Sequence, residues 1–157
     1  MRMSFLHNLK LRFSPPRITD PDFGNLLFMF IPNDPEQSYW ECEWTFPKTG
    51  TVISIGLSGD ESGPRPEARQ FYLSLPGRFE QILECARPRL EEVFRAWLDE
   101  DLPKDIFTVV KLAGFGLEDA KTKPVEWDIS FETTGEKWLG INIPFVGDMA
   151  QQAVVDT

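Results

Sequence analysis

Acidic side chains at every second position mark two segments of the sequence. Glu41 and Glu43 alternate with apolar residues in "SYWECEWTFP", and Glu126, Asp128 and Glu132 lie at outward positions in "PVEWDISFE". Same-face neighbours on a strand lie about 6.6–7 Å apart. That separation suits the two carboxylates of an inverting glycosidase or the ligands of a hard cation.

Three roles are open to these acids: the solvated side of an ordinary strand, an acidic recognition face, and a catalytic or metal site. The pattern favours the first, because any half-buried antiparallel strand exposes polar residues at every second position. Trp138 lies out of phase with Leu139 and Ile141, so it either contacts a partner or covers the neighbouring Gly140. The candidate partner-binding residues are therefore Glu41, Glu43, Glu126, Asp128, Glu132 and Trp138.

Residue types that carry nucleophilic or metal chemistry are scarce. His7 is the only histidine, and its apolar neighbours indicate a surface or edge-strand residue rather than a catalytic base. Cys42 and Cys85 both lie in phase with apolar residues and are predicted to be small core residues. The stretch "AGFG" lacks the lysine and Ser/Thr of a phosphate-binding loop and is predicted to be an ordinary loop. No catalytic residue, metal site or cofactor is expected.

Alternating apolar residues predict strands on both sides of a central helix. Before the helix they occur in "NLKLRF", "NLLFMFIP", "SYWECEWTFP" and "TVISIGL". After it, "DIFTVVKLAGFG" begins as a strand, and "PVEWDISFE" and "WLGINIPF" form a hairpin. Gly24 is expected to adopt a positive φ after the loop "DPDF". Residues 150–157 are expected to form a short helix or to fray.

Between these strands the apolar period changes to three and four residues. The change predicts one amphipathic helix over about residues 76–99, with a shorter helix in "PEARQFYLS" before it. Ser74 is a candidate N-cap for the longer helix. Pro88 should bend or interrupt that helix, because proline cannot donate the backbone hydrogen bond of the helical ladder.

The order of strands, helix and strands predicts an α+β fold. The links between consecutive strands are too short for parallel crossovers, so a largely antiparallel sheet of five to six strands is expected. The long helix then packs on one face of the sheet and leaves the other face in water. At 157 residues, the chain is expected to form a single domain, residues 1–157.

The charge of the chain narrows the classes of partner. The formal net charge is −9 and the pI is about 4.6, which argues against nucleic acid and anionic membrane surfaces as ligands. The same charge suits a basic protein partner. The sequence shows neither a signal peptide nor an apolar run of the roughly 20 residues that cross a bilayer, so a cytoplasmic location is expected.

The order of short motifs resembles a group of small bacterial domains of unknown function, some of them encoded near polymorphic-toxin genes. The motifs are an Asp followed by Phe-Gly, a strand with Trp and Asp, a hairpin, a glycine-containing strand and a final Val-Gly. The resemblance implies an α+β fold and, for some members, an immunity function; it implies no catalytic residues. The matching positions are Asp20, Phe23, Gly24, Trp127, Asp128, Gly140, Ile141, Ile143, Val146 and Gly147.

The leading functional hypothesis is a small acidic binding module, such as an immunity protein that binds a basic toxin. Two alternatives from other classes stay open: a carboxylate-based enzyme or small-ligand binder, and a structural subunit that forms homo-oligomers through an exposed strand edge. An open acidic face favours the first hypothesis, a closed pocket favours the second, and an apolar edge favours the third.

Overall fold

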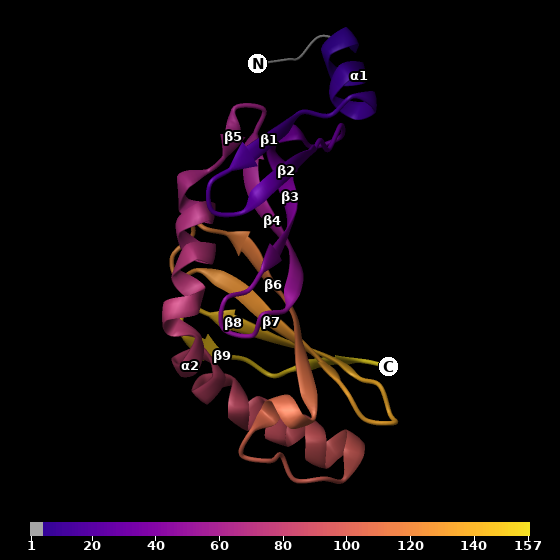
Figure 1. Ribbon diagram of the computed structural model, residues 1–157, viewed down its shortest axis with the longest axis vertical. Helices are drawn as coiled ribbons and strands as arrows, with labels where there is room; N and C mark the ends of the chain where they lie inside the picture. Colours follow the sequence, from indigo (N-terminus) through magenta and orange to yellow (C-terminus); the bar gives the residue numbers. More distant parts are fainter. Residues whose placement is uncertain (1–4) are drawn as a thin grey trace.

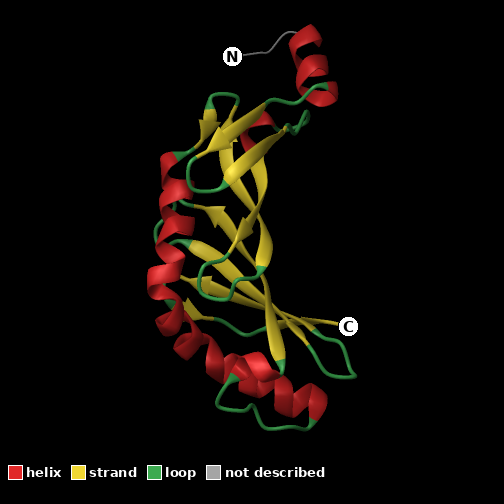
Figure 2. Cartoon of the chain, viewed as in Figure 1, coloured by secondary structure: helices red, strands yellow, loops and turns green. Residues whose placement is uncertain are grey.

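The computed structural model describes residues 5–157. Within that range the chain forms two antiparallel sheets and one long helix (Figures 1 and 2). The first sheet has the order β1-β2-β3-β4-β5 and comprises Arg17–Asp20, Gly24–Met29, Tyr39–Thr45, Val52–Asp60 and Gly63–Pro64. The second has the order β10-β8-β7-β6, with β9 beside β8. Its strands β6 to β10 are Val110–Asp119, Glu126–Thr133, Gly140–Val146, Met149–Ala150 and Val154–Asp156.

The predicted α+β class, the antiparallel pairing and the long covering helix are confirmed. The helix α2 runs over Pro66–Val93 and continues as a π-helical turn, Phe94–Leu98. Short 3₁₀ turns lie at Pro35–Gln37 and Ile106–Thr108. None of the helices within residues 5–157 has the length and hydrophobicity needed to cross a membrane.

The start of α2 at Pro66 corrects the prediction of a separate short helix followed by a helix from residue 76. Ser74 is no cap; its Oγ donates to the Phe71 carbonyl at 2.6 Å inside the helix. Pro76 and Pro88 both lie within the helical span, which is continuous through them, and Figure 1 shows that the helix is bent. Each proline removes one backbone bond, but the apolar face buried against the sheets holds the helix together.

The segment "NLKLRF" is helical, where its alternation predicts a strand. It forms most of α1, Phe5–Phe13, which projects from one end of the molecule (Figure 1). Alternation over six residues does not separate strand from helix, and Leu11 is the buried residue that attaches α1 to the body. A strand would also need a neighbour for its backbone hydrogen bonds, whereas a short helix satisfies most of its own.

Two further segments differ from the sequence predictions. The stretch "AGFG" lies inside β6, where the register against β7 shifts between Leu112 and Gly114. Its glycines allow this irregularity and a close approach of neighbouring atoms, so it is not a loop. Near the end of the chain, Val154–Asp156 pairs with β8 as β10 instead of forming a helix or fraying.

The two sheets meet edge to edge along β4 and β6, which lie in contact although no hydrogen-bonded ladder joins them in the described residues. Helix α2 covers the same face of both sheets (Figures 1 and 2). Aromatic rings fill the space between α2 and the sheets. The ring centroid of Phe46 lies 4.9 and 5.1 Å from those of Phe79 and Phe115, and the centroids of Phe71 and Trp127 are 5.5 Å apart. One core therefore spans both sheets.

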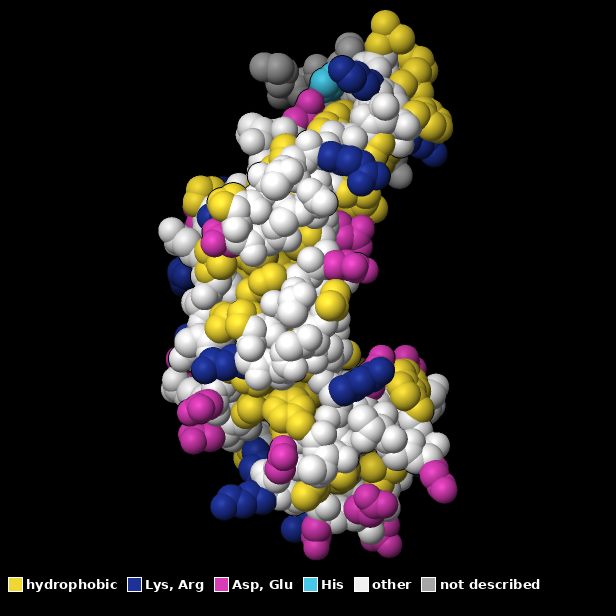
Figure 3. Space-filling model, viewed as in Figure 1, with side chains coloured by type: hydrophobic (Ala, Val, Ile, Leu, Met, Phe, Trp, Pro, Cys, Tyr) yellow, Lys and Arg dark blue, Asp and Glu magenta, His cyan; other side chains and the backbone are white. Residues whose placement is uncertain are grey.

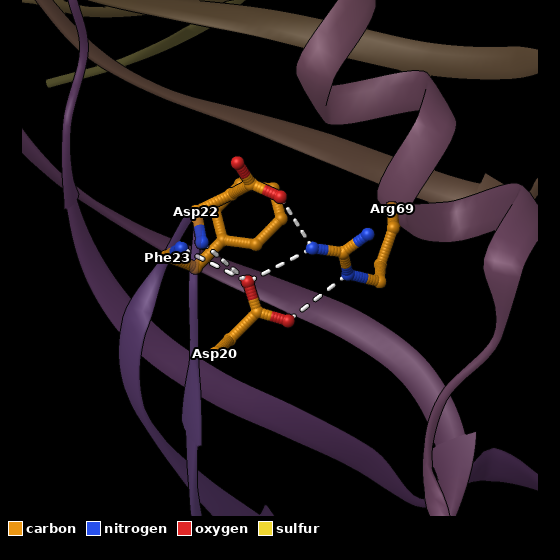
Figure 4. A network of polar contacts seen from close by, with 4 residues as sticks. All are labelled: Asp20, Asp22, Phe23 and Arg69. Atoms are coloured by element: carbon orange, nitrogen blue, oxygen red, sulfur yellow. Dashed lines mark hydrogen bonds and ion pairs between the residues drawn. The ribbon is translucent and has the colours of Figure 1, made fainter.

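An ionic network fastens the first hairpin to α2 (Figure 4). Arg69 donates from Nε and Nη2 to the two carboxylate oxygens of Asp20, both at 3.0 Å, and from Nη2 to Asp22 at 2.6 Å. Asp20 also accepts from the backbone N–H groups of Asp22 and Phe23 at 2.8 and 3.1 Å. The turn ends at Gly24, whose φ of +78° confirms the expected positive φ.

Candidate functional site on the outer sheet face

The faces of the two sheets that point away from α2 form a surface that is called the outer face here. It includes every acidic residue that the sequence predicts as a candidate, but β4 and β6 separate the acids of β3 from those of β7. Apart from Asp60 and Asp119, whose carboxylates accept hydrogen bonds in turns at strand ends, its charged strand residues are the carboxylates Glu41, Glu43, Glu118, Glu126, Asp128, Glu132 and Asp156 and the cations Arg17 and Lys111. Seven acids against two bases make this face strongly negative.

Most of these carboxylates have no cationic partner in the described residues. Glu132 pairs with Lys111 at 3.0 Å. Asp128 accepts from the side-chain amide of Asn142 at 2.9 Å, and the same amide nitrogen donates to Ser130. No ion pair within residues 5–157 involves the five others, Glu41, Glu43, Glu118, Glu126 and Asp156.

The cross-strand neighbours of Glu41 and Glu43 determine whether basic side chains balance the negative charge of β3. Lys10 and Arg12 lie on α1 and have no place in the sheet. In the register of the sheet, Glu41 lies between Leu27 and Gly56, and Glu43 lies opposite Ser54. The negative charge of this strand is therefore not balanced by its cross-strand neighbours.

A cleft of about 410 Å³ opens on the outer face at the seam between β4 and β6; it is called the seam cleft below. Two glycines form its floor. The ring of Tyr39 leans over Gly56, where an added Cβ would lie 3.1 Å from it, and the carboxylate of Asp128 leans over Gly116, where an added Cβ would lie 2.6 Å from Oδ2. Glu118 also lines the cleft.

Tyr72 of α2 closes the seam cleft from the side of the core. Its hydroxyl donates to the Gly56 carbonyl at 3.1 Å, so it occupies an acceptor on the edge of β4 that no neighbouring strand uses. Burial raises the pKa of Tyr72, and the charge of Asp128 raises it further. The hydroxyl is therefore protonated and acts as a fixed donor.

Trp138 both covers its neighbouring glycine and is open to solvent. An added Cβ at Gly140 would lie 3.1 Å from the indole ring, and the side chain is nevertheless 47% exposed. It belongs to the link between β7 and β8, at the end of the sheet where Glu132 lies opposite Gly140. It does not line the seam cleft.

The other residue types considered for catalysis have structural contacts. Burial, followed by the charges of Asp20 and Glu41, raises the pKa of Cys42 to about 11, so the thiol is protonated and weakly nucleophilic at neutral pH. His7 contacts Glu61 at 2.6 Å. In residues 5–157 no three His, Cys, Asp or Glu side chains are grouped so that they could hold a metal ion.

The lowered carboxyl pKa values lie away from the seam cleft. The pKa of Asp20 is lowered mainly by the hydrogen bonds from Arg69, and the pKa of Asp60 is lowered mainly by the hydrogen bonds from Ser62. The pKa of Asp119 is lowered by hydrogen bonds from the backbone N–H of Lys121 and from the side chain of Thr122. These three carboxylates stabilise turns or the fold, and none of them lines the cleft.

Sequence reasoning identified Asp128 but missed the other residues of the seam cleft. Tyr39, Gly56, Gly116 and Glu118 come from three strands, and their proximity depends on the contact between β4 and β6. The one signal available in advance was a glycine within each of two apolar strands, which marks a bulge or a close approach. That signal does not say which strands meet.

The chain matches no family model, no curated protein and no solved structure. A functional conclusion therefore rests on the sequence pattern, the fold and the surface of the molecule.

Proposed function

We propose that the protein is a binding module that recognises a cationic protein through the outer face. The observation that carries the proposal is the excess of seven carboxylates over two cations on that face, with six of the seven carboxylates in no ion pair within residues 5–157. The resemblance to immunity-type domains agrees with a partner that is a basic toxin. A binding module of this kind needs no catalytic group.

Shape and charge act together on this face. In Figure 3 the side of the molecule remote from α2 is concave at mid-height; acidic side chains lie above and below the hollow, and one basic side chain also lies at its lower rim. A concave negative surface attracts a convex positive one before contact and orients it as it approaches. Such steering increases the association rate and weakens as salt rises past about 0.15 M.

The seam cleft offers an anchor for one Lys or Arg side chain of the partner. Tyr39 provides an aromatic ring, and Asp128 and Glu118 provide carboxylates. A cation between a ring and a carboxylate gains both cation–π and charge-assisted hydrogen-bond energy. Anchor residues in partly desolvated pockets commonly provide most of the binding energy of an interface.

The test compares two variants with the same change in net charge in a pull-down from the native host. Glu41→Lys/Asp128→Lys replaces two acids of the outer face with bases, and Glu80→Lys/Glu84→Lys makes the same change at two exposed positions of α2. The expected result is a captured protein with a pI above about 9 that the first variant loses and the second retains. Its association rate should fall as salt is raised.

A single substitution then tests the anchor. Asp128→Asn keeps the shape of the side chain and removes its charge, and it should weaken the purified complex by about tenfold. A captured partner that is acidic, that is insensitive to salt, or that binds the outer-face variant as well as the wild type would contradict the proposal.

A further inference from the structure

A second cleft, of about 550 Å³, lies between the first half of α2, the loop after β6 and the turn after β8. It shares no lining residue with the seam cleft. The residues of its wall that bear on a ligand are Gln70, Arg78, Lys121, Lys123 and Trp127. It is called the basic cleft below.

The charge of the basic cleft is opposite to that of the molecule. The chain as a whole carries −9, whereas the cleft is lined by the cations Arg78, Lys121 and Lys123 against the acids Glu67 and Asp148. Three cations at one concave site in an acidic protein create a local positive potential, which attracts anions.

Arg78 is held rigidly within this cleft. Its guanidinium lies over the rings of Phe71 and Trp127, at 5.8 and 5.9 Å from their centroids. Trp127 is itself fixed, since its Nε1 donates to the Gly147 carbonyl at 2.8 Å. Its ring also stacks on that of Phe145, with 4.3 Å between the ring centroids. A guanidinium stacked in this way is preorganised and loses little side-chain entropy when an anion binds.

Arg78 nevertheless lacks the acceptors that its neighbours on α2 possess. Its Nε is buried and has no hydrogen-bond partner within residues 5–157, and its one ion pair there is a single contact of 3.5 Å with Asp148. Arg87, by contrast, donates to Glu91 and to the carbonyls of Leu102, Pro103 and Lys104. A buried guanidinium N–H without an acceptor is unfavourable, and a bound oxyanion would supply one.

We propose that the basic cleft binds the phosphate group of a small molecule, with Arg78 as the principal donor. Lys121 and Lys123 act as point charges that match the two negative charges of a phosphate monoester. Asp148, whose side chain is 77% exposed, competes with the phosphate for Arg78 and turns toward solvent when the phosphate binds. This site is independent of the outer face and of the proposed function.

The test is an NMR titration of the full chain with inorganic phosphate and, separately, with glycerol phosphate, against sodium chloride at matched ionic strength. Backbone amides around Arg78, Lys121 and Gly147 should shift and saturate with a Kd on the order of 1 mM or tighter. Tighter binding of glycerol phosphate identifies an ester as the ligand, and tighter binding of inorganic phosphate identifies the free ion.

Two variants change the affinity in opposite directions. Arg78→Gln should weaken binding at least about tenfold. Asp148→Asn removes the competing carboxylate and should strengthen binding by about two- to threefold. Arg95→Gln, which changes an arginine on the far end of the helix with a 73% exposed side chain, is the matched control and should bind as the wild type does.

Absence of saturation up to about 50 mM of either compound would overturn the proposal. Equal shifts in Arg78→Gln and the wild type, or weaker binding by Asp148→Asn, would overturn it as well. The Asp148 variant keeps the test decisive if Arg78→Gln does not fold, because it leaves the stacked arginine in place.

Discussion

The arginines of α2 and its π-helical turn differ from the carboxylates of the outer face in how many partners the fold provides. Each of the five arginines of the helix, Arg69, Arg78, Arg87, Arg89 and Arg95, has an ion pair within the described residues. On the outer face, Glu132 has one. Both regions are at the surface, so exposure alone does not explain the difference.

The contrast indicates which charges maintain the fold and which are free to act on another molecule. Arg69 joins the first hairpin to the helix, and Arg87 holds the loop that leads to β6. A carboxylate without a cation contributes little to stability but projects its potential into solvent. Arg78 is intermediate, with one long contact, and the basic cleft is proposed on that basis.

The largest stability effect is expected where the helix and the first hairpin are linked. Asp20→Ala should lower the free energy of unfolding by about 3 kcal/mol, because it leaves a partly buried Arg69 and two backbone N–H groups without their acceptor. Urea denaturation measures the change. Glu43→Ala on the outer face is the control, and an equal loss in both variants would remove the distinction between the two regions.

The same carboxylate should govern part of the acid sensitivity. Arg69 lowers the pKa of Asp20 in the folded protein. The stabilisation is therefore complete above the ordinary carboxyl pKa of about 4 and is lost as pH falls through the lowered value. Asp20→Asn should cost about 1–2 kcal/mol at neutral pH and reduce the slope of stability against pH below about pH 4.

Denaturation curves collected between about pH 3 and pH 6 would show that change in slope. Asp60 and Asp119 also have lowered pKa values, so the slope should decrease without vanishing. An unchanged slope of stability against pH in Asp20→Asn would mean that the ion pair with Arg69 does not contribute to the loss of stability in acid.

A smaller effect is expected at the seam cleft, where the outer face is closely packed. Gly116→Ala places a methyl group about 2.6 Å from the carboxylate of Asp128 and should cost about 1 kcal/mol. In an Asp128→Ala background the same change should be nearly neutral. A double-mutant cycle measures the coupling, and additive effects would show that the two residues are not in contact.

The smallest effect is expected for the unpaired carboxylates. Glu43→Gln and Glu126→Gln should each change the free energy of unfolding by no more than about 0.5 kcal/mol, because no ion pair within residues 5–157 is lost. The same substitutions should slow association with the basic partner. A loss of stability above about 1 kcal/mol would assign these acids a role in the fold rather than in binding.

The local spacing of apolar residues was enough to predict the central strands and the existence of one long helix. In β3, β7 and β8, the inward residues Trp40, Trp44, Trp127, Ile129, Ile141 and Ile143 are buried as the alternation predicts. Burial of one face requires a period of two in a strand and of about 3.6 in a helix. These periods are visible in the sequence because each depends on one segment and a generic apolar environment.

Short or proline-containing segments were predicted less well, because their local signals compete with tertiary packing. Six alternating residues in α1 fit either periodicity. The long helix is predicted to start at about residue 76, yet α2 begins ten residues earlier, because residues from Tyr72 to Leu90 bury a continuous apolar face against the sheets. The packing of that face outweighs the missing backbone bonds.

Composition and local periodicity were enough to establish that the protein is acidic, that its fold is α+β and that acids line the solvent side of two strands. Three features depend on tertiary contacts: β4 and β6 meet, Tyr39 and Asp128 flank one cleft, and the buried Nε of Arg78 has no acceptor whereas Nε and Nη2 of Arg69 donate to carboxylates. The reason is physical: each of these features joins residues from distant segments. Strand register and edge contacts depend on the whole core, which no local period specifies.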